Sequence, residues 1–298
     1  MQTPDRSLAD QLPRDLPWNK TVALLLDGVS VEQLPRQLYT WSSAPDFEPL
    51  YLGTRWSELN DISPCLIRLS GQNDPIFQQF LTNSDQEWGY LVFSDQSWDS
   101  VVDHFRWLIC VTHPQGTEVL LRVADPAVVH ALLDQTEQQD ARLFGPCSEI
   151  LTADTALQCW HQHHRPQNAP AISHVKPYQL NDSQIALLGE VNFRSVVLRL
   201  DQHMQEYFPT FQAHLQKPER WKYLNELASQ SYERGFCSEL DITLYANLHG
   251  FLGVTALKEH PDLNVLLETT SEQTPTQRLE HIASIAKERA ESLQRNPG

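Results

Sequence analysis

Hydrophobic residues between Thr21 and Ile150 alternate between short continuous runs and segments of helical period. The continuous runs, rich in Val, Leu and Ile, predict five strands: TVALLLDG, PCLIRL, WGYLVFS, EVLLRVAD and GPCSEIL. The intervening segments predict four helices: VEQLPRQLYTW, DPIFQQFL, SWDSVVDHFRWLICV and DPAVVHALL. Because near-continuous apolar strands are typical of a covered sheet, we expect an α/β domain with a mixed or mostly parallel sheet and helices on both faces.

A change of pattern follows this region. The segment 161–177, HQHHRPQNAPAISHVKP, contains three prolines and few periodic apolar positions, which is typical of a linker. Beyond it, apolar residues recur at helical spacing, and Gly235, Ser238 and Thr274-Pro275 supply helix stop and start signals. We therefore predict an N-terminal extension over 1–20, an α/β domain over 21–162, a linker over 163–177 and an all-helical lobe over 178–298.

Charge and cysteine content narrow the classes of partner. The 298 residues include 22 Lys and Arg against 38 Asp and Glu, a formal net charge of −16, which gives no attraction to nucleic acid or anionic lipid. Five scattered cysteines without a CxxC pair are typical of free thiols in a reducing compartment. Since no apolar run approaches the ~20 residues of a membrane span, we expect a cytoplasmic protein without membrane insertion.

The dipeptide Asp125-Pro126 has two interpretations. It is either part of a catalytic site or a helix start, with Asp125 as N-cap and Pro126 at the first helical position. The same arrangement occurs at Asp74-Pro75, where nothing else suggests chemistry, and Arg122 is close enough to pair with Asp125. We favour the structural interpretation. An α/β hydrolase-like enzyme with a loop-built site stays open, with Asp27, Asp125, His104 and His130 as its polar candidates, and so does a small-ligand-binding regulator.

Other candidate chemistry is weak. The sequence has no G-x-S-x-G, G-x-x-x-x-G-K-[ST] or H-E-x-x-H motif. The run from His161 to His164 lacks the ligand spacing of a zinc site, and its place in the predicted linker indicates a solvated tract. His104 and Arg106 lie at the edge of an apolar helix stripe and are expected to pair with neighbouring carboxylates. We therefore expect no catalytic residue, no cofactor and no metal ion.

The order of these segments resembles the adaptor chaperones of bacterial type VI secretion, the Tap or TEC adaptors, first described as a domain of unknown function. ALLLDG ends in Asp27-Gly28, and PCLIRL follows it as the second strand. WGYLVFSDQSWDSVVDHFRWL contains His104 and Arg106, LLRVADPAVVHALL contains Arg122 and Asp125-Pro126, and LFGPCSEI completes the series. The resemblance covers about residues 21–160. It departs from the family where aromatics and an arginine usually stand, at Val123, Ala124 and Ala127.

This resemblance implies a protein without catalysis that binds a secreted toxin effector in the cytoplasm and helps to load it onto the VgrG spike protein. The helical lobe would hold the effector. Partner surfaces are enriched in aromatic residues, and those at a helix end, in a turn or off the apolar stripe are the candidate partner-binding residues: Phe208, Phe211, Tyr223 and Phe236. Trp221 and Tyr232 share a stripe with Leu224 and are expected to be buried.

Overall fold

The computed structural model describes residues 7–134, 140–167, 173–269 and 272–295. Contacts between residues divide the chain into two compact units, Met1–Val191 and Asn192–Gly298. Helix α6 (Asp182–Tyr207) begins in the first unit and ends in the second.

The first unit contains a six-stranded sheet in the order β2-β3-β1-β4-β7-β8. Its strands are β1 (Thr21–Leu26), β2 (Phe47–Pro49), β3 (Cys65–Arg68), β4 (Gly89–Ser94), β7 (Cys147–Asp154) and β8 (Cys159–His164). All five neighbouring pairs are antiparallel. The prediction of a mixed or mostly parallel sheet is therefore wrong for this sheet.

The chain connectivity explains the antiparallel pairing. Strands β3 and β4 both run antiparallel to β1, so they run parallel to each other, and helix α2 (Pro75–Thr82) connects them. This is the strand–helix–strand crossover that the sequence pattern indicates. However, β1 lies between the two parallel strands, so the crossover does not produce a parallel neighbour.

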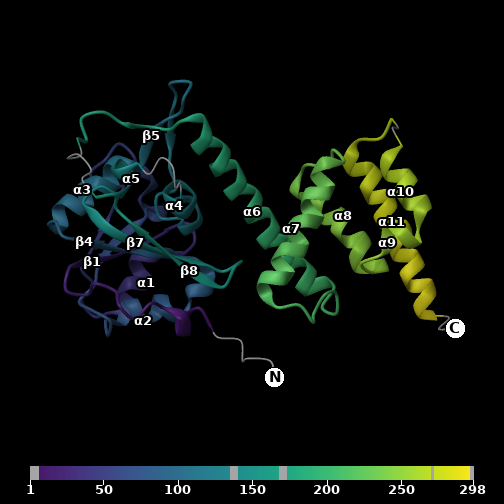
Figure 1. The fold of residues 1–298 in the computed structure, drawn as a ribbon, viewed down its shortest axis with the longest axis horizontal. Coiled ribbons are helices and arrows are strands. Elements are labelled where there is room, and N and C mark those ends of the chain that lie inside the picture. The colour runs from purple at the N-terminus through teal and green to yellow at the C-terminus, as the bar shows by residue number, and fades with distance from the viewer. Residues whose placement is uncertain (1–6, 135–139, 168–172, 270–271, 296–298) are drawn as a thin grey trace. The chain divides into compact units, whose positions relative to one another are not determined.

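Helices cover both faces of this sheet, as the apolar strands predict. Figure 1 shows α1 (Leu34–Trp41) and α2 on one side and three further helices on the other: α3 (Trp98–Leu108), α4 (Pro126–Leu133) and α5 (Ala141–Phe144). Alternate residues of β1 divide between two cores. Leu24 and Leu26 pack with the residues of α1 and α2, whereas Ala23 and Leu25 pack with those of α3 to α5.

The strands of a small second sheet show that one predicted strand is shorter than expected. Strand β5 (Cys110–Thr112) pairs antiparallel with β6 (Glu118–Leu120) and parallel with β9 (Tyr178–Gln179). The predicted strand EVLLRVAD is thus limited to its first three residues, and Arg122 lies in the turn after it. The backbone turns here to reach the start of helix α4. Within this turn, the Val123 amide donates to the Leu121 carbonyl at 2.8 Å. The described residues of this unit also include three 3₁₀ helices: η1 (Ala9–Gln11), η2 (Ser57–Ile62) and η3 (Ser84–Gln86).

The described part of the second unit is helical, as expected. It contains the end of α6 and five further helices: α7 (Lys217–Glu233), α8 (Glu239–Leu252), α9 (Ala256–Glu259), α10 (Pro261–Glu268) and α11 (Pro275–Arg295). Ser238 and Asp241 form the predicted reciprocal cap of α8, and Gly235 has a φ of +84° after α7. Within the described ranges, no helix combines the length and apolar character needed to cross a membrane.

Candidate functional site

Asp27, Arg122 and Asp125 form an ion cluster at the end of strand β1. Arg122 donates from Nη2 to Asp27 Oδ2 at 2.6 Å, and its Nη1 lies 3.1 Å from Asp125 Oδ2. Asp27 also accepts from the Val29 amide at 3.1 Å and the Ser30 hydroxyl at 2.9 Å. The Arg122–Asp125 pair is the one expected from the sequence. Its connection to Asp27 was not predicted.

The second oxygen of Asp125 caps helix α4. Oδ1 accepts from the amides of Ala127 at 3.0 Å and Val128 at 3.3 Å, and Pro126 occupies the first helical position. Both oxygens of this carboxylate are therefore engaged in holding a loop to a helix. The same cap forms at Asp74, which accepts from the Ile76 amide. The arrangement braces the structure and presents no carboxylate set aside for proton transfer.

Gly28 lets the chain turn directly after Asp27. A Cβ atom built on Gly28 would lie 2.4 Å from the Ser63 carbonyl oxygen, a distance that a side chain cannot adopt. The backbone segments after β1 and before β3 thus pass in direct contact. The Asp-Gly ending of the first strand therefore combines a close backbone approach with an anchor for Arg122.

His104 is a buried packing residue between helices α3 and α5. Its Nε2 lies 3.2 Å from the Leu143 carbonyl oxygen, and its Nδ1 lies 3.2 Å from Nε2 of His174. Burial lowers the pKa of His104 to about 3, so the ring is neutral and Nε2–H donates to the carbonyl. Gly145, with a φ of +60°, makes room for it, because a Cβ there would lie 2.3 Å from the ring.

These contacts divide the expectations for the helix α3 motif. The interpretation of His104 as a stripe-edge residue paired with a carboxylate is wrong, since its partners are a carbonyl and another imidazole. Arg106 does contact a carboxylate, donating from Nη2 to Glu48 Oε2 at 3.0 Å, and so joins α3 to β2. Both residues connect elements that are distant in the sequence.

Three histidines gather where helix α4 meets strand β8. Nδ1 of His130 lies 3.1 Å from Nε2 of His163, and the rings of His130 and His161 are stacked with centroids 3.8 Å apart. The interpretation of residues 161–164 as a solvated tract is therefore wrong. They belong to β8, and His163 is buried.

Cys159 and His161 do not have the geometry of a catalytic pair. Cys159 Sγ lies 3.7 Å from His161 Nε2, and the same nitrogen lies 3.4 Å from Asp154 Oδ2. A catalytic histidine contacts its nucleophile and its orienting carboxylate through different nitrogens. Burial, together with the nearby Asp154, also raises the pKa of the Cys159 thiol, which disfavours the reactive thiolate.

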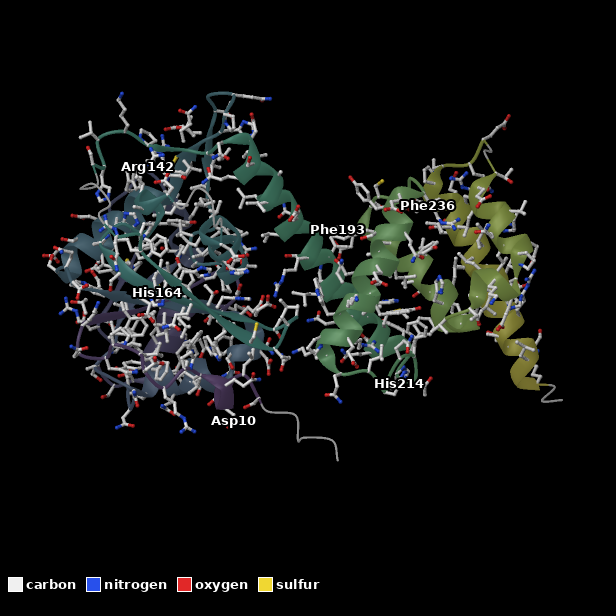
Figure 2. All side chains as sticks on the ribbon, in the orientation of Figure 1. Asp10, Arg142, His164, Phe193, His214 and Phe236 are labelled. Carbon is white, nitrogen blue, oxygen red and sulfur yellow. The ribbon has the colours of Figure 1, made fainter. Side chains whose placement is uncertain are left out.

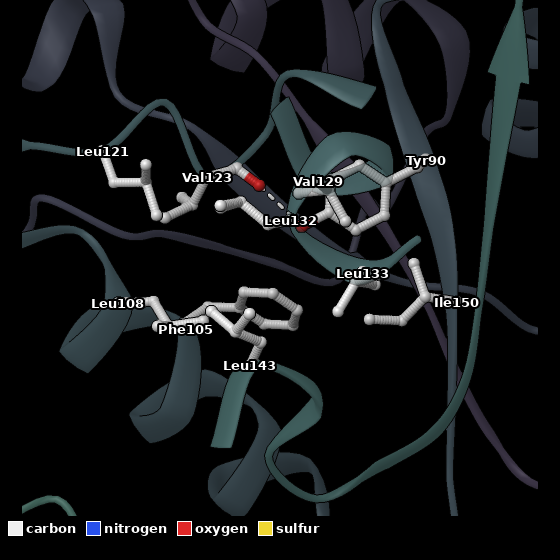
Figure 3. Close-up of a pocket in the computed structure, with 10 residues that line it drawn as sticks. All are labelled: Tyr90, Phe105, Leu108, Leu121, Val123, Val129, Leu132, Leu133, Leu143 and Ile150. Carbon is white, nitrogen blue, oxygen red and sulfur yellow. Dashed lines mark hydrogen bonds between the residues drawn. The ribbon is translucent and has the colours of Figure 1, made fainter. Parts of the chain in front are cut away.

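Two hollows of the first unit differ in size and lining. One is a cavity of about 20 Å³, drawn in Figure 3, whose apolar wall includes Phe105 and Leu132. The Tyr90 hydroxyl there donates to the Val123 carbonyl at 2.6 Å. This volume holds about one water molecule and excludes a metabolite.

The other hollow is an open polar groove of about 690 Å³. It is lined by Pro114, Asp140, Arg142 and the segment 178–182 together with Gln184. The Arg142 side chain donates to both oxygens of Asp140, from Nε at 3.0 Å to each and from Nη2 to Oδ2 at 2.6 Å. The Tyr178 hydroxyl also donates to Asp140 Oδ2 at 3.1 Å. Because Asp140 already neutralises Arg142 and Asp182 adds a second carboxylate to the lining, the groove is not suited to an anion.

The candidate partner-binding aromatics have unequal exposure. The expectation that Phe211 and Phe236 are exposed is wrong, because both are buried in the helical core, whereas Phe208 and Tyr223 are half-buried. Phe236 lies within the helical unit (Figure 2), directly after the Gly235 turn, and its amide donates to the Ser231 carbonyl. Such a helix ending normally includes an apolar contact back onto the helix, which accounts for the burial of a turn residue.

The stripe residues of helix α7 also differ from expectation. Trp221 is half-buried against the helical core, whereas the Tyr232 side chain is exposed and meets only the edge of the Phe193 ring among the described aromatic contacts. Tyr232 stands in the last turn of the helix, where the apolar stripe ends. The expectation of its burial is therefore wrong.

Comparison with known proteins shows similarity to one described family and to an accessory protein. Residues 24–143, which include the ion cluster and His104, match the family described as domain of unknown function DUF4123. This match confirms the resemblance recognised from the motifs of the first unit. Over 283 residues the chain is 29% identical to accessory protein VasW of Vibrio cholerae serotype O1, covering 92% of this chain and 90% of that protein. No solved structure matches the chain.

Proposed function

We propose that this protein is a type VI secretion adaptor that binds a toxin effector in the cytoplasm and helps to load it onto the VgrG spike protein, without catalysis. The observation that carries the proposal is the match to an accessory protein across both units rather than across the DUF4123 domain alone. An adaptor needs a stable scaffold and an additional surface for its cargo, and the two units offer these two parts.

The contacts of the α/β unit support a scaffold role. Arg122 forms ion pairs with both Asp27 and Asp125. His104 is hydrogen-bonded to the Leu143 carbonyl, and Arg106 forms an ion pair with Glu48. An enzyme of the hydrolase type would direct such groups at a substrate in an open pocket. Here they join segments of the same unit, which supports recognition by surface contact rather than catalysis by these groups.

Exposed aromatics of the helical unit are the proposed cargo contacts. The side chains of Tyr207 and Tyr232 are 62% and 55% exposed, respectively. Half-buried Phe208 follows Tyr207 in the chain, and half-buried Tyr223 also stays a candidate. Exposed tyrosines supply large contact area at low entropic cost, which is why they are frequent at partner interfaces.

Co-purification tests this proposal. The tag-free chain is produced together with a tagged effector and, separately, a tagged VgrG encoded by neighbouring genes, and complexes are isolated by affinity and size-exclusion chromatography. We expect a stable complex with the effector. Absence of a complex with either protein would refute the adaptor function.

Matched tyrosine variants test the contact surface. Tyr207→Ser and Tyr232→Ser should each weaken effector binding about tenfold or more, as loss of an interface aromatic does. Tyr39→Ser is the control, because Tyr39 is 63% exposed but lies on helix α1 of the other unit. Equal weakening by all three variants would contradict the proposed surface.

The net charge of the first unit suggests how association with the effector or the spike protein is accelerated. Residues 1–191 contain 11 Lys and Arg against 24 Asp and Glu, a net charge of −13. Such a surface attracts a basic patch on the effector or the spike, and salt screens the attraction. The association rate measured by surface plasmon resonance should fall as salt rises, and a rate independent of salt would exclude this steering.

A further inference from the structure

A helix and a strand bring three metal-ligating side chains together. His130 and Asp134 stand four residues apart at the end of helix α4, and His163 lies on β8, which packs against that helix. Their ligand atoms all lie within 4.8 Å of one another. Residues spaced by four share one face of a helix, the spacing that places two ligands on a single ion.

The distances suit a tetrahedral ion. Two atoms bound at about 2.0–2.1 Å to tetrahedral zinc lie roughly 3.3 Å apart. Nδ1 of His130 and Nε2 of His163 are 3.1 Å apart, so an ion can replace their hydrogen bond with little movement. Asp134 is exposed, and its carboxylate can close the remaining distance by side-chain rotation.

The surroundings orient the proposed ligands. His163 is buried on strand β8. The ring of His161 stacks on the ring of His130 and fixes its plane, and His161 Nε2 lies 3.4 Å from Asp154 Oδ2. Metal sites typically include such residues, which do not bind the ion but orient the ligands that do.

We propose that His130, Asp134 and His163 form a binding site for one divalent transition-metal ion of the zinc class, which fastens helix α4 to the edge strand β8. Two imidazoles and one carboxylate are suited to zinc, nickel or cobalt and poorly suited to magnesium or calcium, which prefer oxygen ligands alone. Three protein ligands leave the fourth position to water.

Calorimetric titration of the tag-free, chelator-treated full-length chain with zinc chloride tests the site. We expect one equivalent to bind and to raise the melting temperature, while magnesium chloride does neither. Asp134→Asn should weaken zinc binding by roughly tenfold or more, since even groups behind the ligands contribute 10- to 100-fold. Because Asp134 is exposed, this variant keeps the fold. His130→Ala should abolish the binding.

His164→Ala is the matched control. His164 neighbours His163 on β8, but its side chain is exposed and lies 3.9 Å from Glu149, and Figure 2 labels it on this strand. Zinc binding should be unchanged in this variant. The proposal is overturned if the wild-type chain binds no zinc, if Asp134→Asn and His130→Ala bind it as wild type does, or if His164→Ala loses it equally.

Discussion

Replacing Arg122 with alanine should destabilise the α/β unit more than replacing its partner Asp27. Arg122→Ala leaves two carboxylates without their shared cation, and the Asp27 side chain is only 7% exposed. Removing one partner of a buried pair costs about 3–5 kcal/mol. Since Asp27 keeps its hydrogen bonds from Val29 and Ser30, we expect about 3 kcal/mol, the lower end of this range.

Asp27→Ala should cost less because the group it leaves behind is accessible to water. The Arg122 side chain is 53% exposed and keeps Asp125 as a partner. Val29 and Ser30 are also exposed, so water can replace the lost acceptor. The loss is then about 2 kcal/mol, the net value of one charge-assisted hydrogen bond. The double variant should cost less than the sum of the two single variants, because the two residues interact directly.

Urea unfolding followed by tryptophan fluorescence measures these differences. Seven of the eight tryptophans lie before residue 192, and Trp221 alone lies in the helical unit. The fluorescence signal therefore reports chiefly on the unit that contains the ion cluster, although the chain has two units. The reasoning fails if Arg122→Ala lies within 1 kcal/mol of wild type, or if Asp27→Ala is the more destabilised variant.

Three further predictions concern packing and pH. Gly145→Ala should lower the free energy of unfolding by about 3 kcal/mol, because the new side chain strains the backbone and clashes with His104. Gly189→Ala is the control, at a helical position with open space, and should raise the free energy of unfolding by about 0.5–1 kcal/mol. Equal urea midpoints for the two variants would contradict this. The pKa of His104 falls from 6.5 in the unfolded chain to about 3 in the folded protein. Its contribution to stability is therefore complete above pH 6.5 and decreases below that pH by about 1.4 kcal/mol per pH unit. His104→Gln should lose this pH dependence when urea midpoints are compared at pH 7 and pH 5. Phe236→Ala should destabilise the helical unit by about 3–5 kcal/mol, and Tyr232→Ser by less than about 0.5 kcal/mol, as measured by circular dichroism.

The features predicted correctly from the sequence depend on near neighbours. The caps at Asp74, Asp125 and Ser238 each join a side chain to an amide two or three residues later. Such signals are complete within a short segment, so the helix starts could be predicted without knowledge of the fold. The layered α/β arrangement also followed, because buried strands must be apolar on both faces.

The features that the sequence did not reveal depend on long-range pairing. Asp27 and Arg122 are 95 residues apart, and His130 and His163 are 33 residues apart. No periodicity connects such positions. The direction of the strands was predicted wrongly for a related reason. The apolar sequence of β1 indicates that the strand is buried on both faces, but it carries no information on the direction of its neighbours.

The motif residues of the α/β unit each join elements that the chain order separates. Asp27 and Arg122 connect the end of β1 to the start of α4, and Arg106 connects α3 to β2. These residues therefore encode the scaffold, so replacing them should reduce stability and complex formation together. A change at Tyr207 should reduce complex formation alone, because its exposed side chain contributes little to the core. Under the proposed adaptor function, we therefore expect surface residues outside the motif, rather than the motif itself, to determine which partner is bound.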